Sequence, residues 1–257
     1  NSEHNFTHFE LRSNFTGTEK SRQKISLIEG MPHRVLKLSD LKLTREYSDF
    51  PTLRTPQILL NTLAASAPVV VLSSLYGAES AGQYTIAIAT LGAPAALIGN
   101  SVQQVFYPRI NRAFSCGEQV TRLISKATFA LFIAGLTPFG LIMIFGPELF
   151  ELVFGSNWQK SGNFAQWLSL WFFSILVNKA VVAAIPVIKR QGFFLIFEIT
   201  SLLLKGTTLF VSHYIWGMDI RTVQAFSIVS SILNIALIIA ILQISAQIET
   251  KKRQNDA

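Results

Sequence analysis

Charged residues are scarce in this sequence. Only 14% of the 257 residues are Asp, Glu, Lys or Arg, whereas half are hydrophobic and the mean hydropathy is +0.39. Soluble domains carry about 25% charged residues, so the shortfall indicates a lipid environment. The net charge of +7 by itself would suggest a nucleic-acid partner. However, most cations lie in the tail or beside long apolar runs, as membrane orientation requires, so we expect no nucleic acid among the partners.

Cysteine and catalytic motifs are lacking as well. Cys116 is the one cysteine, which excludes a disulfide framework and a thiolate metal site. The patterns HExxH, GxGxxG and GxxxxGK[ST] do not occur. His213 and Asp219 share a predicted loop, but no motif places a serine or cysteine nucleophile with them. We therefore expect no enzyme, no metal and no cofactor.

Long apolar runs, by contrast, are abundant. They are continuous, without the period of two that strands show, and a bilayer core of about 30 Å needs roughly 20 such residues in a helix. The sequence therefore predicts an all-α membrane protein, a bundle of six transmembrane helices. The expected spans are 56–76, 82–104, 124–145, 164–186, 192–212 and 223–245. The expected domains are a polar cytosolic segment 1–46, a transmembrane lobe 47–245 and a cytosolic tail 246–257.

The distribution of lysine and arginine predicts the orientation. Outside the spans, eighteen cations lie at the chain ends and in alternate connections, whereas the remaining connections hold only Lys160 and Arg221. The positive-inside rule then places both termini in the cytosol. Trp158, Trp167 and Trp216 fall near the outer interface, where amphipathic rings are favoured.

Prolines interrupt several spans. Pro94, close to Gly92, and Pro138 lie within the second and third spans, and Pro186 lies near the inner end of the fourth. Because proline removes a backbone donor and clashes with the preceding turn, we expect bends or breaks there. Such bends fit a bundle that flexes, and equally one that simply packs.

Three ionisable residues lie inside the spans: Lys179 in the fourth, and Glu198 and Lys205 in the fifth. A charge at the bilayer centre costs at least about 2.5–3.5 kcal/mol, so each should face protein or water. At 1.5 Å per residue, Glu198 is level with Lys179 on the adjacent helix, and we predict that the two could pair. Lys205 would lie deeper without an acid at its depth. Glu198 either neutralises the lysines for insertion, or the lysines line a cationic lumen for an anionic cargo.

Four amides lie at one depth near the inner ends of the first two spans. Gln57 and Asn61 belong to the first span, and Gln103 and Gln104 to the second. Amides at this depth either hydrogen-bond between helices or line a water-filled cavity.

Three motifs follow one another with span spacing: "YSDFPTLRTPQILLN", "IGNSVQQVFYPR" and "FGPELFELVFGSNWQKSGNFAQWL". Over about residues 34–245 the chain resembles the polysaccharide transporter branch of the multidrug/oligosaccharidyl-lipid/polysaccharide exporter superfamily, the bacterial O-antigen and capsule-unit flippases. Members of this branch have two lobes of six helices. The resemblance implies that this chain is the C-terminal half of such a protein and that its partner is a missing N-terminal lobe. Residues 1–30 lack the apolar sixth span expected there, so we expect a fragment.

The resemblance implies translocation of undecaprenyl-diphosphate-linked oligosaccharide across the inner membrane for O-antigen, capsule or exopolysaccharide synthesis. The expected substrate-binding residues are Lys179, Lys205, Gln57, Asn61, Gln103 and Gln104, with Glu198 coupling transport to an ion gradient. The alternatives are a multidrug exporter of the same superfamily, a membrane polysaccharide polymerase or ligase, and a non-transporting remnant.

Overall fold

The computed structural model describes residues 49–255, and the described residues from Thr52 onward form one compact unit. The predicted polar segment 1–46 lies outside the described residues. The described part contains helices and no strand. Its elements are α3 (Asp49–Tyr76), α4 (Ala78–Ser115), α5 (Val120–Phe154), the 3-10 turn η1 (Ser156–Trp158), α6 (Gln159–Ala184), α7 (Gln191–Trp216) and α8 (Asp219–Asn255). Six helices are long and apolar enough to cross a membrane, which confirms the predicted fold class.

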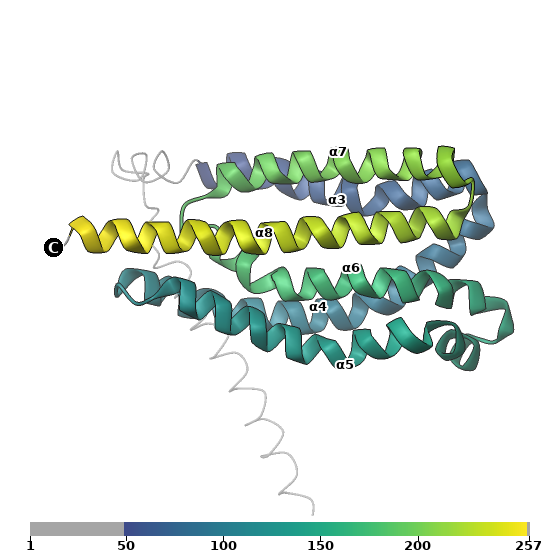
Figure 1. Cartoon of the computed structure of the whole chain (residues 1–257), viewed down its shortest axis with the longest axis horizontal. Helices are drawn as coiled ribbons and strands as arrows, with labels where there is room; N and C mark the ends of the chain where they lie inside the picture. The colour runs from purple at the N-terminus through teal and green to yellow at the C-terminus, as the bar shows by residue number, and fades with distance from the viewer. Residues whose placement is uncertain (1–48, 256–257) are drawn as a thin grey trace, which may run out of the picture. The chain divides into compact units, whose positions relative to one another are not determined.

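Helix α6 is the centre of the lobe. It packs against α4, α5 and α8, and α7 packs against α8 (Figure 1). Its buried residues lie around the whole circumference of the helix, as expected for a helix surrounded by others. Phe164, Leu168 and Leu176 are fully buried, and the Trp171 ring lies edge-on to Phe226 of α8 with centroids 5.0 Å apart.

Helix α3 is anchored to the lobe at its C-terminal end. The Tyr76 hydroxyl hydrogen-bonds to Thr222 Oγ1 over 2.7 Å, and its ring lies 5.0 Å from that of His213. These contacts join the end of α3 to the end of α7 and the start of α8. Among residues 59–75 of α3, whose side chains the structure describes, about half are exposed.

Helices α4, α5 and α8 are longer than the predicted spans. They contain 38, 35 and 37 residues, respectively, well above the roughly 20 that a bilayer requires. Helix α5 is extended mainly at its C-terminal end, whereas the C-terminal extensions of α4 and α8 lie at the other end of the lobe, where α5 begins. There the Thr121 N–H donates to Glu249 Oε1 over 2.7 Å, and Arg109 forms an ion pair with Glu118 over 2.6 Å.

The prolines affect the helices differently from the prediction. Helix α4 continues through Pro94, and α5 continues through Pro138. The non-helical dihedral angles in α5 fall at Phe145, two residues before Pro147, whose missing N–H and bulky ring disturb the preceding turn. Pro186 lies in the turn directly after α6 ends.

Candidate functional site

A cavity of about 400 Å³ lies within the lobe and is lined by residues of α3, α4, α6, α7 and α8. This volume lies within the usual range of ligand sites. Aromatic and aliphatic side chains form much of the wall, including Trp171 and Phe172. The polar lining consists of Asn61, Asn178, Lys179, Glu198, Ser201, Lys205 and Asn234.

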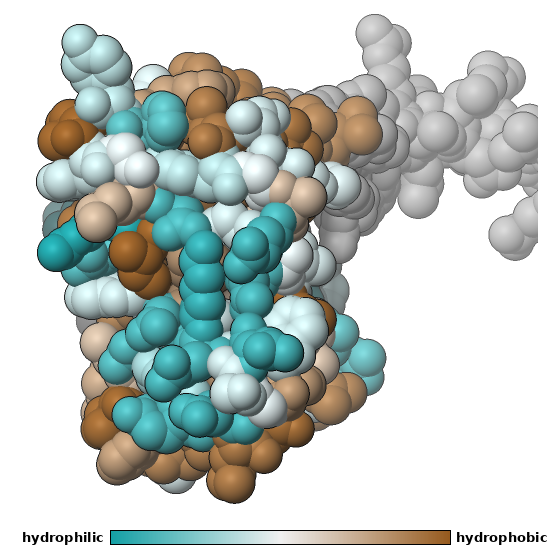
Figure 2. All heavy atoms as spheres, turned by 90° about the vertical axis from the view of Figure 1, so that its right-hand side faces the viewer, coloured by the Kyte–Doolittle hydropathy of each residue, from teal (hydrophilic) through white to brown (hydrophobic). Residues whose placement is uncertain are grey.

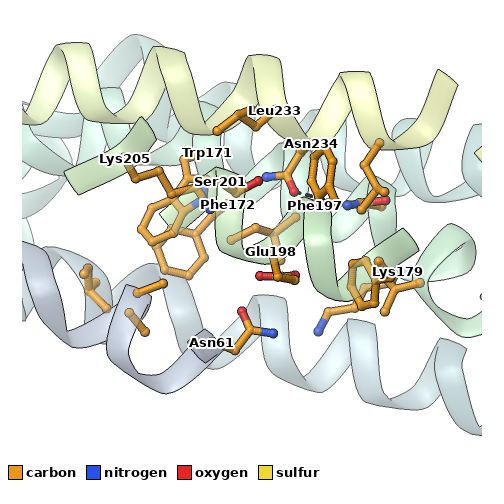
Figure 3. A pocket seen from close by; sticks show the side chains of 18 residues that line it. Asn61, Trp171, Phe172, Lys179, Phe197, Glu198, Ser201, Lys205, Leu233 and Asn234 are labelled. Atoms are coloured by element: carbon orange, nitrogen blue, oxygen red, sulfur yellow. Dashed lines mark hydrogen bonds between the residues drawn. The ribbon is translucent and has the colours of Figure 1, made fainter. Parts of the chain in front are cut away.

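Four of the seven predicted site residues line this one cavity. Asn61 comes from α3, Lys179 from α6, and Glu198 and Lys205 from α7. In Figure 3 the amide of Asn61, the ammonium of Lys179 and the carboxylate of Glu198 point into the same space from three helices. The three ionisable side chains are half-buried. They therefore share a site although they are far apart in the sequence.

Gln103 and Gln104 are not among the described residues that line this cavity. Gln103 is half-buried and Gln104 is exposed on α4. Gln57 belongs to α3, but its side chain is not among those that the structure describes. Equal depth in the membrane could not reveal on which side of α4 these two amides lie.

The predicted ion pair between Glu198 and Lys179 is wrong. The described residues contain two ion pairs, Arg109–Glu118 and Lys160–Asp219, and neither lies in the cavity. Glu198 instead interacts electrostatically with Lys205, two turns along the same helix. Because the stem of Lys179 lies against α4 at Gly99, the position of its ammonium is set by packing and not by depth alone.

A hydrogen-bonded chain joins α6 to α8 at the wall of the cavity. The Asn178 Nδ2 group donates to Asn234 Oδ1 over 3.1 Å, and Asn234 Nδ2 donates to Ser174 Oγ over 2.9 Å. Asn178 Oδ1 and the hydroxyl of Ser201 are buried and have no partner in the protein. Since buried polar atoms are normally satisfied, these two can bind water or a ligand that enters the cavity. The sequence analysis missed this group, although Asn178 directly precedes Lys179.

A second polar cluster lies at the end of the lobe where α6 and α8 begin. Lys160 Nζ lies 2.7 Å from Asp219 Oδ2, and Ser80 of α4 donates a hydrogen bond to the same carboxylate oxygen. Figure 2 views the lobe from this end and shows hydrophilic residues across it, with hydrophobic residues toward the sides. The cluster ties three helices together and is suited to a membrane–water interface.

The fold and the cavity define a multi-pass α-helical membrane protein with a polar site inside the helical lobe. The chain matches the family described as polysaccharide biosynthesis protein over residues 25–163, which is more than half of its length, and it belongs to that family. No curated protein and no solved structure matches it. The family fits the resemblance to polysaccharide flippases and gives the chain a role in polysaccharide biosynthesis.

Proposed function

We propose that this chain is part of a flippase that moves undecaprenyl-diphosphate-linked oligosaccharide across the bacterial inner membrane, with both termini in the cytosol. The supporting observation is the shared cavity inside the membrane lobe, which two lysines and one glutamate line. The translocated oligosaccharide would serve O-antigen, capsule or exopolysaccharide synthesis.

The charge of the cavity suits a diphosphate. Moving an anion out of water is unfavourable unless it is paired and hydrogen-bonded. Lys179 and Lys205 supply opposite charge, while Asn61 and the unpartnered hydroxyl of Ser201 supply hydrogen-bonding groups. The cavity of about 400 Å³ would hold the diphosphate and adjoining groups, and the prenyl chain would remain in lipid.

The transport cycle requires no covalent chemistry from this chain, so we propose a transporter and not an enzyme. A second six-helix lobe would close the other side of the cavity, and the two lobes would rock about the bound headgroup, as transporter repeats do. Glu198 is the acid of the cavity and the candidate for binding the coupling ion, because it forms no ion pair.

The competing functions fit less well. A multidrug exporter of cationic cargo would have to bind its substrate beside two lysines and one glutamate. A polymerase or ligase needs room for its chemistry outside the membrane. At the end of the lobe that holds Asp219, the described connections are short, namely Gly77, 155–158 and 217–218. None of them is a large loop that could carry such chemistry.

The proposal is tested by co-expressing this chain with the six-helix first lobe of a family member and reconstituting the pair in vesicles with lipid-linked oligosaccharide. Flipping is measured as exposure of the sugar to an added glycosidase. We expect activity that a Lys179→Gln, Lys205→Gln double variant loses at unchanged protein amount. Unchanged flipping in that variant, or export of a cationic dye in place of the glycolipid, would contradict the proposal.

A further inference from the structure

A second hollow, of about 360 Å³, lies between the end of α7 and the beginning of α8. It is lined by Trp216, Arg221, Gln224, Ala225, Ile228 and Val229. We define these six residues as the α7–α8 groove. Its polar side chains lie in the first turns of α8 and its aliphatic side chains lie further along the helix. The groove is therefore polar at one end and apolar at the other.

The groove is separate from the cavity. Residues of an α-helix are 100° apart, because 3.6 residues make a turn. On that basis Arg221 and Ile228 of the groove lie about 120–180° around α8 from Asn234 and Leu237, which line the cavity. A ligand in the groove would thus contact the outside of the lobe and not the transported headgroup.

Arg221 gives the groove a positive charge that no acid neutralises. Among the described residues, no carboxylate forms an ion pair with Arg221, whereas Lys160 at the same end of the lobe is paired with Asp219. Arg221 Nη1 donates to Gln224 Oε1 over 3.1 Å, which holds the exposed guanidinium over the groove. A guanidinium that is held in place and still has unused donors is well suited to phosphate oxygens.

An exposed apolar stripe continues from the groove along α8. Ile228, Ile232, Ile235 and Ile239 are between 37% and 59% exposed, and their spacing of three or four residues places them on one face. From Ile228 to Ile239 the helix rises about 16 Å, at 1.5 Å per residue. That is roughly half of the 30 Å hydrocarbon core, the depth of one leaflet. At the polar end, Trp216 is 51% exposed, as in side chains that anchor at the interface.

We propose that the α7–α8 groove binds one anionic phospholipid of the bilayer. Its phosphate lies on Arg221, its glycerol region lies against Trp216, and one acyl chain follows the isoleucine stripe. The charge of Arg221 and the continuity of polar mouth and apolar stripe select a lipid over a soluble phosphate. The inference concerns the outer surface of the lobe and does not depend on the cargo of the cavity.

The test uses Trp216 as a reporter. Trp158, Trp167 and Trp171 are replaced by phenylalanine, and the chain is reconstituted in phosphatidylcholine vesicles. Brominated phosphatidylglycerol or brominated phosphatidylcholine is then added at equal mole fraction, and quenching of Trp216 fluorescence is measured. We expect an apparent binding constant about fivefold larger for the anionic lipid, the ratio that one interfacial cation contributes. The preference should disappear in Arg221→Gln and persist in part in Arg221→Lys.

Equal quenching by the two lipids would overturn the proposal, and so would a preference that survives Arg221→Gln. Because Trp171 packs in the core, the same comparison is also made by native mass spectrometry, with all four tryptophans present. Bound phosphatidylglycerol should be retained by the unmodified chain and lost from the Arg221→Gln variant. Because Arg221 is exposed, this substitution should leave the fold intact. Equal retention by both proteins would overturn the proposal. Inorganic phosphate should not displace the lipid, and if it does, the groove is a site for soluble phosphate.

Discussion

Gly99 of α4 provides the space in which the side chain of Lys179 lies. A Cβ atom on Gly99 would lie 2.9 Å from Cε of Lys179 and 3.3 Å from both Cδ and Cγ. The methylene groups of the lysine therefore cross the α4 backbone at a position where an added Cβ would force the lysine side chain to shift. The ammonium then reaches the cavity beside Asn61 and Glu198 (Figure 3). Gly99 is thus a positioning residue for Lys179.

The first prediction follows from this contact. In the complete transporter, Gly99→Ala should lower flipping by about tenfold, because misplacing a group by an ångström is enough to lose one to two orders of magnitude in rate. The rate is measured by the glycosidase assay. Gly92→Ala in the same helix is the matched control. Its Cβ would lie at an ordinary 3.6 Å from Phe172, so near-normal flipping is expected.

A double-mutant cycle separates positioning from packing. If Gly99 acts through Lys179, then Gly99→Ala should add little loss once Lys179→Gln is present. Additive losses would mean that Gly99 matters only for how α4 and α6 pack together.

The second prediction concerns Lys205, which lines the cavity near the middle of α7. Lys205→Ala should insert and fold normally but reduce flipping sharply, because it removes one of two cations from the proposed diphosphate site. Lys205→Arg should keep part of the activity, since the charge remains while the geometry changes. Glu198→Gln is the control. If the three charges serve insertion alone, then both neutral variants should lower the protein amount more than the activity per molecule.

The membrane fold could be derived from the sequence because length, apolarity and charge distribution are local properties. Each of the six expected spans corresponds to one helix. Helix ends were less predictable, since α4 and α8 continue as polar, basic helices beyond the apolar runs. There the tertiary contact between Thr121 and Glu249 supports the helix end.

The site was only partly predictable for a different reason. Depth in the membrane can be read from residue number, and it drew attention to Lys179, Glu198 and Lys205, which line the same cavity. The direction of each side chain around its helix depends on neighbours that the sequence does not show. The stem of Lys179 packs against Gly99, and among the described residues its ammonium forms no ion pair with Glu198. The chain from Asn178 to Asn234 could be found only after α6 and α8 were seen to pack together.

The third prediction concerns the ion pair between Lys160 and Asp219. Lys160→Met should lower the free energy of unfolding by about 1 kcal/mol, because surface ion pairs contribute up to that amount and Asp219 keeps its hydrogen bond from Ser80. Asp219→Ala should have a larger effect, since the carboxylate also joins α4 and α8. Thermal unfolding of the purified chain in detergent measures both. Equal effects of the two variants would show that the ion pair alone accounts for the stabilisation.

The fourth prediction concerns the orientation of the lobe in the membrane. The α3–α4, α5–α6 and α7–α8 connections lie at one end of the lobe, and the α4–α5 connection lies at the other (Figure 1). Lys160 and Arg221 are at the first end, whereas Arg109, Arg112 and Arg122 are at the second. From the excess of cations we predict that the second end faces the cytosol.

The free and exposed Cys116 makes this orientation measurable without a reporter fusion. In intact cells, a membrane-impermeant maleimide should leave Cys116 unlabelled and should label it after the cells are broken. In a Cys116→Ser background, Ser156→Cys and Met218→Cys should both be labelled in intact cells, because both positions are exposed at the opposite end. Labelling of Cys116 in intact cells, without labelling at 156 and 218, would reverse the orientation. The cavity would then take up its anionic headgroup from the other leaflet, and the proposed direction of transport would be wrong.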